Sequence, residues 1–327
     1  MIQIPNTFHI HALARRIVEY TSVGELADIL PSLQSEPYMH MGGGSNLLFV
    51  GNYEGTLLHS RISGVEVVDE DADSVSVRVG AGMVWDDFVA YTVGRGWSGA
   101  ENLSLIPGEV GASAVQNIGA YGAEVCNIIE SVECIDLRTG EPRTFTRDDC
   151  QYSYRSSVFK HQYRAMYAVV YVTYRLSKHF TPQLGYGNLA SRFIDSAPTL
   201  ATLRQAIIEI RRAKLPDPEV TGNAGSFFMN PVVSETKFQS LLSQYPSMPF
   251  YHVDGGVKIP AGWMIEQCGW KGRELGPAAV HNVSALVLIN LGGATGDDIL
   301  RLCHAVQDDV KCKFGVEIHP EVNIVGN

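Results

Sequence analysis

Residues 106–122 constrain the fold of this chain more than any other segment. This run of seventeen residues holds four glycines and three alanines, and its one charged side chain is Glu109. Such a composition suits backbone that packs flat against a planar ligand or a pyrophosphate. The alternative is a buried helix start made of small residues and closed by a glycine turn.

A second glycine cluster occupies residues 42–46, with the sequence Gly-Gly-Gly-Ser-Asn. Glycines reach positive φ at little cost, and consecutive amides can then surround a phosphate. Leu47, Leu48 and Phe49 follow as a strand pattern, so the cluster is not a dinucleotide fingerprint that opens a helix. Alone, the cluster is equally compatible with a tight turn. Together, the two small-residue clusters favour a large nucleotide cofactor.

Length and charge exclude several classes of protein. The chain has 327 residues and a net charge of −10, which predicts two or three domains and argues against nucleic acid or an anionic membrane as a partner. We expect no membrane association, because no apolar stretch reaches the roughly 20 residues that span a bilayer. The N-terminus lacks a secretory pattern, so we expect a cytoplasmic protein. Six cysteines without C-x-x-C spacing predict reduced thiols and no metal site.

Hydrophobic periodicity predicts the main helices and strands. Helices are expected after Ser22, over 85–92, over 200–210 with basic residues at its end, over 261–268, and from Thr295 onward. Strands are expected before residue 42, from residue 47, and over 74–79, 132–137, 168–176, 285–291 and 316–325. In the last of these strands, Glu321 and Asn323 alternate with Val322 and Ile324, so a carboxylate can face a site built by other segments.

Two prolines in three residues, Pro216 and Pro218, predict a domain junction after the helix that ends near Lys214. The hundred or so residues beyond it have the pattern of a compact α/β unit.

Two further segments carry reactive side chains. Ser226 stands between glycine and two aromatic residues and is either a hydroxyl proton donor in a dry pocket or part of a loop turn. Arg155 stands among hydroxyl residues and is either a clamp for a carboxylate or a surface arginine. Arg211, Arg212 and Lys214 are cations at a helix end or attract a substrate phosphate.

Nine segments in this order resemble the UDP-N-acetylenolpyruvoylglucosamine reductase family of flavoenzymes, which serves bacterial peptidoglycan precursor synthesis. They are residues 6–8, 44–48, 101–108, 116–122, 154–160, 214–218, 222–231, 261–263 and 320–322. The resemblance runs over nearly the whole chain.

The resemblance implies an α+β fold with a FAD-binding part of the vanillyl-alcohol-oxidase type in two subdomains, plus an α/β substrate-binding domain. The expected bounds are 1–66 and 67–215 for the FAD-binding subdomains, 216–315 for the substrate domain, and 316–327 for a strand that returns Glu321 to the FAD-binding part.

The same resemblance implies FAD as cofactor and NADPH as hydride donor. Because residues 42–46 contain no histidine that could attach flavin, we expect FAD to be bound non-covalently. The implied cofactor-binding residues are Gly42, Gly43, Gly44, Ser45, Asn46, Leu47, Ile106, Pro107, Gly111, Asn117, Ile118, Gly119, Ala120 and Gly122.

Three residues map onto the catalytic positions of the family. Ser226 is implied as the proton donor to the substrate carbon, and Arg155 as the group that stabilises the developing enolate. Glu321 is the implied carboxylic residue; facing a substrate carboxylate, it is either protonated or paired with a cation.

Substrate contacts are implied for Tyr121, Tyr186, Lys214 and Asn230, and a tyrosine at position 186 is typical of the long form of the family. The chain departs from the family pattern in two places. Met229 stands where a polar residue is common, and the loop of residues 281–284 lacks the glutamine expected near Ser284. The expected partners are a UDP-sugar nucleotide and NADPH, and the expected state is a monomer.

Two other functions stay open at this point. The same flavin fold could serve an oxidase or dehydrogenase of a small hydroxy acid or lactone. A nucleotide-binding module without catalysis is the third possibility.

Overall fold

The computed structural model describes residues 1–33, 36–187 and 189–326. Contacts divide the chain into two units, each with its own core. The first unit comprises Met1–Ile2, Ala14–Gly43 and Glu54–Arg211, and the second comprises Gln3–Leu13, Gly44–Tyr53 and Arg212–Asn327. The subdomain bounds expected above stay a prediction.

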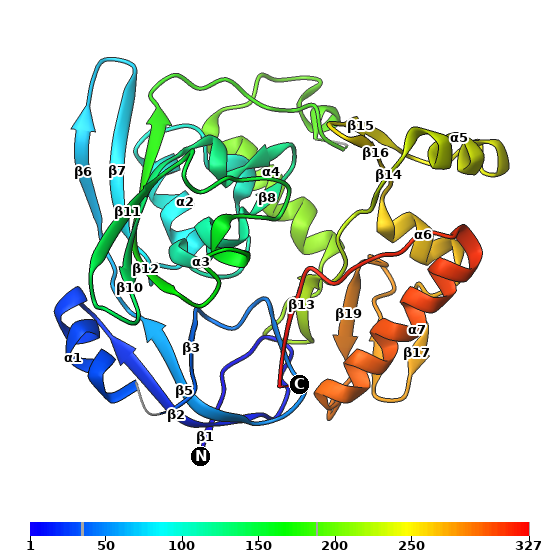
Figure 1. The fold of residues 1–327 in the computed structure, drawn as a ribbon. Coiled ribbons are helices and arrows are strands. Elements are labelled where there is room, and N and C mark those ends of the chain that lie inside the picture. The colour runs from blue at the N-terminus through cyan, green and yellow to red at the C-terminus, as the bar shows by residue number, and fades with distance from the viewer. Residues whose placement is uncertain (34–35, 188, 327) are drawn as a thin grey trace. The chain divides into compact units, whose positions relative to one another are not determined.

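The first part of unit 1 is a sheet in the order β1-β2-β5-β3 with one helix against it (Figure 1). Its strands are β1 (Ile2–Gln3), β2 (Leu13–Tyr20), β5 (Tyr53–Ser60) and β3 (Tyr38–Met41), and its helix is α1 (Val23–Leu33). The predicted helix start is confirmed, because the Ser22 hydroxyl accepts the Glu25 amide at 3.1 Å. Leu26, Leu30 and Leu33 of α1 pack into a core with Leu58.

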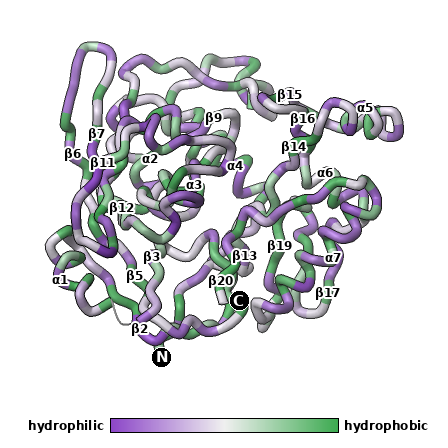
Figure 2. The backbone as a smooth tube through the Cα atoms, in the orientation of Figure 1, coloured by the Kyte–Doolittle hydropathy of each residue, from purple (hydrophilic) through white to green (hydrophobic). Residues whose placement is uncertain are grey.

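The second part of unit 1 is an antiparallel sheet in the order β11-β10-β12-β7-β6. Its strands are β11 (Pro142–Thr146), β10 (Ile129–Asp136), β12 (Tyr167–Ser177), β7 (Ser74–Gly80) and β6 (Val65–Glu70). The turn between β6 and β7 is strongly hydrophilic (Figure 2). The strands predicted over 74–79, 132–137 and 168–176 are confirmed.

Two helices pack against this second sheet, α2 (Trp85–Gly94) and α3 (Val110–Gln116). The residues that set the predicted period of α2, Trp85, Phe88, Val89 and Thr92, are all buried. Phe88 stacks on Tyr174 of β12 with ring centroids 4.8 Å apart. Because α3 is short and made of small residues, its backbone lies close to the sheet.

Helix α4 (Leu200–Lys214) leads from the first unit into the second. In unit 2, one sheet has the order β13-β19-β18-β17, another has the order β14-β16-β15, and β20 pairs with β4 in parallel. The strands are β13 (Gly222–Ser226), β19 (Val287–Asn290), β18 (Ala278–Val280), β17 (Glu274–Leu275), β14 (Val232–Val233), β16 (Gly256–Lys258), β15 (Tyr251–Val253), β20 (Asn323–Val325) and β4 (Leu47–Phe49).

The helices of unit 2 are α5 (Glu235–Gln244), α6 (Ala261–Gln267) and α7 (Gly296–Phe314). Thr295 caps α7 in a reciprocal arrangement with Asp298, which confirms the predicted helix start. The extended C-terminal segment is also found, but its ladder with β4 is limited to Asn323–Val325.

All six cysteines are free thiols, as expected. No helix in the described part of the chain is long and apolar enough to cross a membrane.

Candidate active site

Part of the small-residue segment in unit 1 forms helix α3, which is largely buried. Both interpretations of this segment stay open, since residues 110–116 form a helix while the following residues form a strained turn. The helix ends at Asn117, which is fully buried and adopts the left-handed region at φ 46°. The Asn117 side chain donates to the carbonyl of Ser153 at 2.8 Å and accepts the Cys126 amide at 3.2 Å. These bonds stabilise a conformation that asparagine tolerates better than most residues.

A tight hairpin follows, formed by β8 (Gly119–Ala120) and β9 (Ala123–Glu124). Tyr121 and Gly122 occupy its two turn positions with φ of 48° and 81°. Positive φ is uncommon for a bulky aromatic residue and often marks a functional site. Within the described residues, no acceptor receives the amides of Tyr121 and Gly122. Two neighbouring free amides in such a turn suit an anionic group such as a phosphate.

Arg155 is fixed beside this hairpin in the same unit. Its own backbone lies in the left-handed region, at φ 55°. The guanidinium donates to the carbonyls of Gly119 at 2.5 Å and Asn117 at 3.4 Å. A Cβ on Gly119 would lie 2.7 Å from Nη1 of Arg155, so glycine is required there for this contact. The ammonium of Lys160 donates to the Arg155 carbonyl at 2.9 Å and to Gln116 at 3.0 Å.

Tyr186 and Arg211 lie near Tyr121 of the hairpin turn. The rings of Tyr121 and Tyr186 meet edge to face, with centroids 6.3 Å apart. Arg211 donates through Nε to the carbonyl of Leu105 at 3.2 Å. Burial lowers the pKa of Arg211, and the positive charge of Arg155 lowers this pKa further. Burial also raises the pKa of the Tyr121 hydroxyl. Two arginines that repel each other favour an anionic ligand between them.

The glycine cluster of residues 42–46 begins beside a buried contact between His59 and Glu109 that was not among the predicted site residues. Nε2 of His59 lies 2.7 Å from Oε1 of Glu109, and both side chains are buried. A Cβ on Gly42 would lie 2.9 Å from the other oxygen of Glu109. Glycine at position 42 therefore makes room for this carboxylate. The signal that could have identified the pair is that Glu109 carries the one charge of the segment 106–122.

In unit 2, the rest of this cluster joins the C-terminal strand. Gly44, at φ 72°, leaves no space for a Cβ, which would lie 2.4 Å from the Pro5 carbonyl. The Asn46 side chain donates to the Glu321 carbonyl at 3.4 Å, and the Asn323 amide donates to the Asn46 carbonyl at 3.1 Å. Residues nearly 280 positions apart are thereby adjacent, as the parallel pairing of β4 with β20 requires. A strand follows the glycines, as predicted.

Ser226 ends strand β13 and is exposed. The β13–β19 ladder shifts register between Asn223 and Ser226, which is a β-bulge, and Gly225 there has φ 67°. The Asn223 side chain accepts the Gly225 amide at 2.8 Å and so holds the bulge. Bulges redirect the side chains that follow them and occur often beside active sites. Phe227 and Phe228, directly after Ser226, are buried.

Replacing Gly225 with alanine is expected to destabilise the protein by roughly 1–2 kcal/mol, because an L-residue pays that cost in the left-handed region. No atom outside its neighbours lies within 4 Å of a Cβ at this position, so the cost is conformational and not steric. Gly225→Asn tolerates the same φ and is the control. Equilibrium denaturation should rank wild type above Asn and Asn above Ala. Equal stability of the Ala variant and the wild type would contradict the role of the bulge.

Glu321 lies next to the serine strand through backbone contacts. Its amide donates to the carbonyl of Phe227 at 2.8 Å, and Phe228 and Pro320 form an antiparallel bridge. The structure thus brings the segments of Ser226, Glu321 and Asn46 together within one unit. In unit 1 it brings Arg155 together with Asn117 and Gly119, and Tyr121 together with Tyr186.

The other expected substrate residues have clear structural environments. Lys214 is exposed at the end of α4. Asn230 accepts the amide of Ala261 at 2.9 Å and so holds the start of α6. At the two positions that depart from the family pattern, the Met229 amide donates to the His319 carbonyl, and the Ser284 amide donates to Nδ1 of His281 at 3.3 Å.

The residues of unit 1 fit a nucleotide cofactor. The hairpin turn of Tyr121 and Gly122 offers amides that have no acceptor within the described residues, and the partly buried Arg211 with Arg155 supplies positive charge. Glu109 carries the one carboxylate of residues 106–122. Because it contacts His59, its negative charge does not act on a nearby phosphate without a partner.

Comparisons with known proteins agree with this arrangement. Residues 14–146 match the family model of a FAD binding domain, and residues 217–325 match the model described as UDP-N-acetylenolpyruvoylglucosamine reductase, C-terminal domain. The chain is therefore a two-part protein whose first part is a FAD-binding domain.

Two relatives show the family. A UDP-N-acetylenolpyruvoylglucosamine reductase of Bacteroides fragilis is 56% identical over 98% of this chain and 97% of its own length. One of Porphyromonas gingivalis is 49% identical over 98% and 96%. The chain belongs to the UDP-N-acetylenolpyruvoylglucosamine reductase family.

The fold is similar to a solved structure as well. The UDP-N-acetylenolpyruvylglucosamine reductase of Thermus caldophilus matches with a TM-score of 0.70 and 20% identity, over 99% of this chain and 98% of that chain. The expected α+β fold with a FAD-binding part and a further domain is confirmed, while its assignment to the vanillyl-alcohol-oxidase type stays a prediction.

Proposed function

We propose that this chain reduces the enolpyruvyl group of UDP-N-acetyl-3-O-(1-carboxyvinyl)-glucosamine to give UDP-N-acetylmuramate for peptidoglycan precursor synthesis. The observation that carries the proposal is the 56% identity to a reductase over nearly the full length of both chains. NADPH is the proposed electron donor, and the proposed setting is a monomer in the cytoplasm.

Non-covalent FAD is the proposed cofactor, held by residues 42–47, by Ile106, Pro107 and Gly111, and by residues 117–120 with Gly122. When bound, FAD would supply hydride chemistry between NADPH and the terminal carbon of the enolpyruvyl group, with flavin N5 as the proposed hydride donor. The free amides of the Tyr121–Gly122 turn support a phosphate contact here.

Ser226 is proposed to donate the proton to the carbon next to the substrate carboxylate. Negative charge builds there as the hydride arrives, and so basic a carbon can take a proton from a positioned hydroxyl. The bulge at Gly225 and the exposed position of Ser226 support this role, because both make the hydroxyl accessible to a ligand.

Arg155 is proposed to stabilise the same negative charge. Its guanidinium is already held by two carbonyls, so little reorganisation is needed when the charge develops. Glu321, whose backbone is bonded to the segment of Ser226, is proposed as the further carboxylic group of the reaction.

Substrate contacts are proposed for Tyr121, Tyr186, Lys214 and Asn230. The exposure of Lys214 and Tyr186 supports access to a nucleotide. The proposed domain bounds are residues 1–66 and 67–215 for FAD and 216–315 for the substrate, followed by the C-terminal strand.

The test is the product formed by the purified holoprotein with NADPH. With the enolpyruvyl sugar nucleotide, mass spectrometry should show a product that has gained one hydride and one proton, with one NADPH consumed for each. NADPH consumption that needs oxygen and leaves the sugar nucleotide unchanged would favour the oxidase. Colourless protein whose melting temperature does not rise with FAD would favour a binding module without catalysis.

A further inference from the structure

Asn102 lies in a short 3-10 helix, Glu101–Leu103, and is buried with 3% of its surface exposed. Its side-chain amide nitrogen donates to two backbone carbonyls, that of Tyr121 at 2.9 Å and that of Gln183 at 3.0 Å. Both partners are acceptors, so the nitrogen, and not the oxygen, of the carboxamide must face them.

The oxygen of the same carboxamide is buried and has no hydrogen-bond partner among the described residues. A buried acceptor without a donor reduces stability. The side chain is therefore poorly suited to a purely structural role, because its carboxamide oxygen accepts no hydrogen bond from the described residues. What it does contribute is the connection between two segments that are 62 positions apart in sequence (183 minus 121).

Each of these segments carries a tyrosine of the proposed substrate site. Tyr121 occupies the strained hairpin turn at φ 48°, and its backbone carbonyl accepts the hydrogen bond from Asn102. Gln183 precedes Tyr186 by three residues, and the rings of Tyr186 and Tyr121 meet edge to face. Asn102 thus fixes the backbone on both sides of this aromatic contact.

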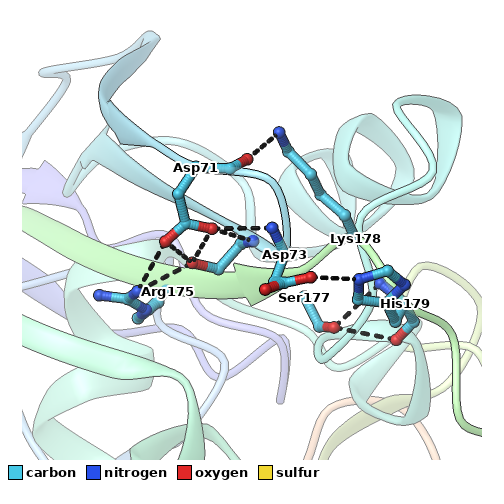
Figure 3. Close-up of polar contacts among 7 residues, drawn as sticks. Asp71, Asp73, Arg175, Ser177, Lys178 and His179 are labelled. Carbon is cyan, nitrogen blue, oxygen red and sulfur yellow. Dashed lines mark hydrogen bonds and ion pairs between the residues drawn. The ribbon is translucent and has the colours of Figure 1, made fainter.

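The segment that leads to Tyr186 is held at its start by surface contacts, and Phe180 and Leu184 pack against a core with Leu203 and Ile207. His179 lies 2.8 Å from Asp73, and Lys178 bonds to the Asp71 carbonyl, as Figure 3 shows. The side chains of His179 and Asp73 are largely exposed, and exposed ion pairs contribute little to stability. Beyond them, Gln183, Gly185 and Tyr186 are exposed. The bond that Asn102 makes to the Gln183 carbonyl therefore restrains the exposed backbone between the apolar contacts of Phe180 and Leu184.

We infer that Asn102 is a positioning residue that joins the Tyr121 turn to the segment 180–187 and so presents both tyrosines to the nucleotide part of the substrate. This inference rests on the proposed function for the identity of the ligand. The joining of the two segments does not depend on it.

The experiment uses the holoprotein and two variants. Asn102→Asp keeps the shape but places carboxylate oxygens against two carbonyls, and Asn102→Leu removes the two donors together with the unpaired oxygen. Asn127→Asp is the matched control, since Asn127 is exposed in the same unit. Limited proteolysis of residues 180–187 by chymotrypsin is measured first, with melting temperature and flavin content as checks on folding.

Cleavage within residues 180–187 by chymotrypsin is expected to become about 10-fold faster or more in both variants, because loss of a hydrogen bond of ordinary net strength raises the population of the open segment by about that factor. The KM for the sugar nucleotide should rise by about 10–100-fold while kcat changes by less than about 3-fold, as expected when binding and not the chemical step is weakened. Reduction of the flavin by NADPH should stay unchanged, and Asn127→Asp should match the wild type.

An unchanged cleavage rate in the Leu variant would overturn the inference, whatever the activity. A parallel loss of kcat, flavin content and melting temperature in both variants would also overturn it, because that is the pattern of a structural residue. Faster cleavage in the variants of a protein whose wild type never turns over the sugar nucleotide would contradict the proposed function and leave the joining role of Asn102 standing.

Discussion

Ser226→Ala is expected to slow transfer of electrons from reduced flavin to the sugar nucleotide by about 10²–10⁴-fold, the range for a positioned proton donor. Reduction of the flavin by NADPH should be almost unaffected, because no proton from Ser226 is needed in that step. Rapid mixing under nitrogen separates the two half-reactions. The hydroxyl is removed from an exposed position at the end of a strand, so the fold should be retained.

Two variants sharpen this prediction. Ser226→Cys keeps a proton donor at the position and should recover part of the lost rate. Ser243→Ala removes an exposed hydroxyl of α5 in the same unit and should behave as wild type. Equal slowing of both half-reactions in Ser226→Ala would contradict the assignment, since it would indicate a disturbed fold or flavin site.

Arg155→Lys is expected to lower kcat by about 10²–10³-fold, the usual effect of losing a preorganised donor to a developing anion. The charge is kept, but a lysine cannot reproduce the planar fork that bonds the carbonyls of Gly119 and Asn117 at once. Steady-state kinetics with the sugar nucleotide measures the effect. Arg164→Lys, an exposed change in the same unit, is the matched control.

A kcat of Arg155→Lys close to that of the wild type would contradict the proposed role of the guanidinium, because it would mean that a positive charge alone is sufficient to stabilise the developing anion. Loss of bound FAD in the variant would likewise argue for a structural role, so the flavin content of each preparation must be measured.

Local patterns in the sequence were sufficient for much of the fold. Helix α2 follows from Trp85, Phe88, Val89 and Thr92, which recur at helical spacing and are all buried. Helix α7 follows from its cap at Thr295. Both depend on residues close in sequence, so periodicity and capping rules describe them well.

The features that shape the candidate site depend on contacts between distant residues, which one sequence does not reveal. The bulge before Ser226 exists because β13 pairs with β19, some 60 residues later. The pairing of His59 with Glu109 and the two bonds of Asn102 have the same origin. Positive φ at Tyr121 and Arg155 goes against the local preference of these residue types, and the contacts around them are made by residues distant in sequence.

The central claim is that reduced flavin in this protein passes its electrons to an enolpyruvyl sugar nucleotide. The most direct measurement is the flavin spectrum under nitrogen, after the holoprotein has been bleached with one equivalent of NADPH. Addition of UDP-N-acetyl-3-O-(1-carboxyvinyl)-glucosamine should restore the oxidised spectrum and yield UDP-N-acetylmuramate. A spectrum that stays bleached until oxygen is admitted would contradict the claim.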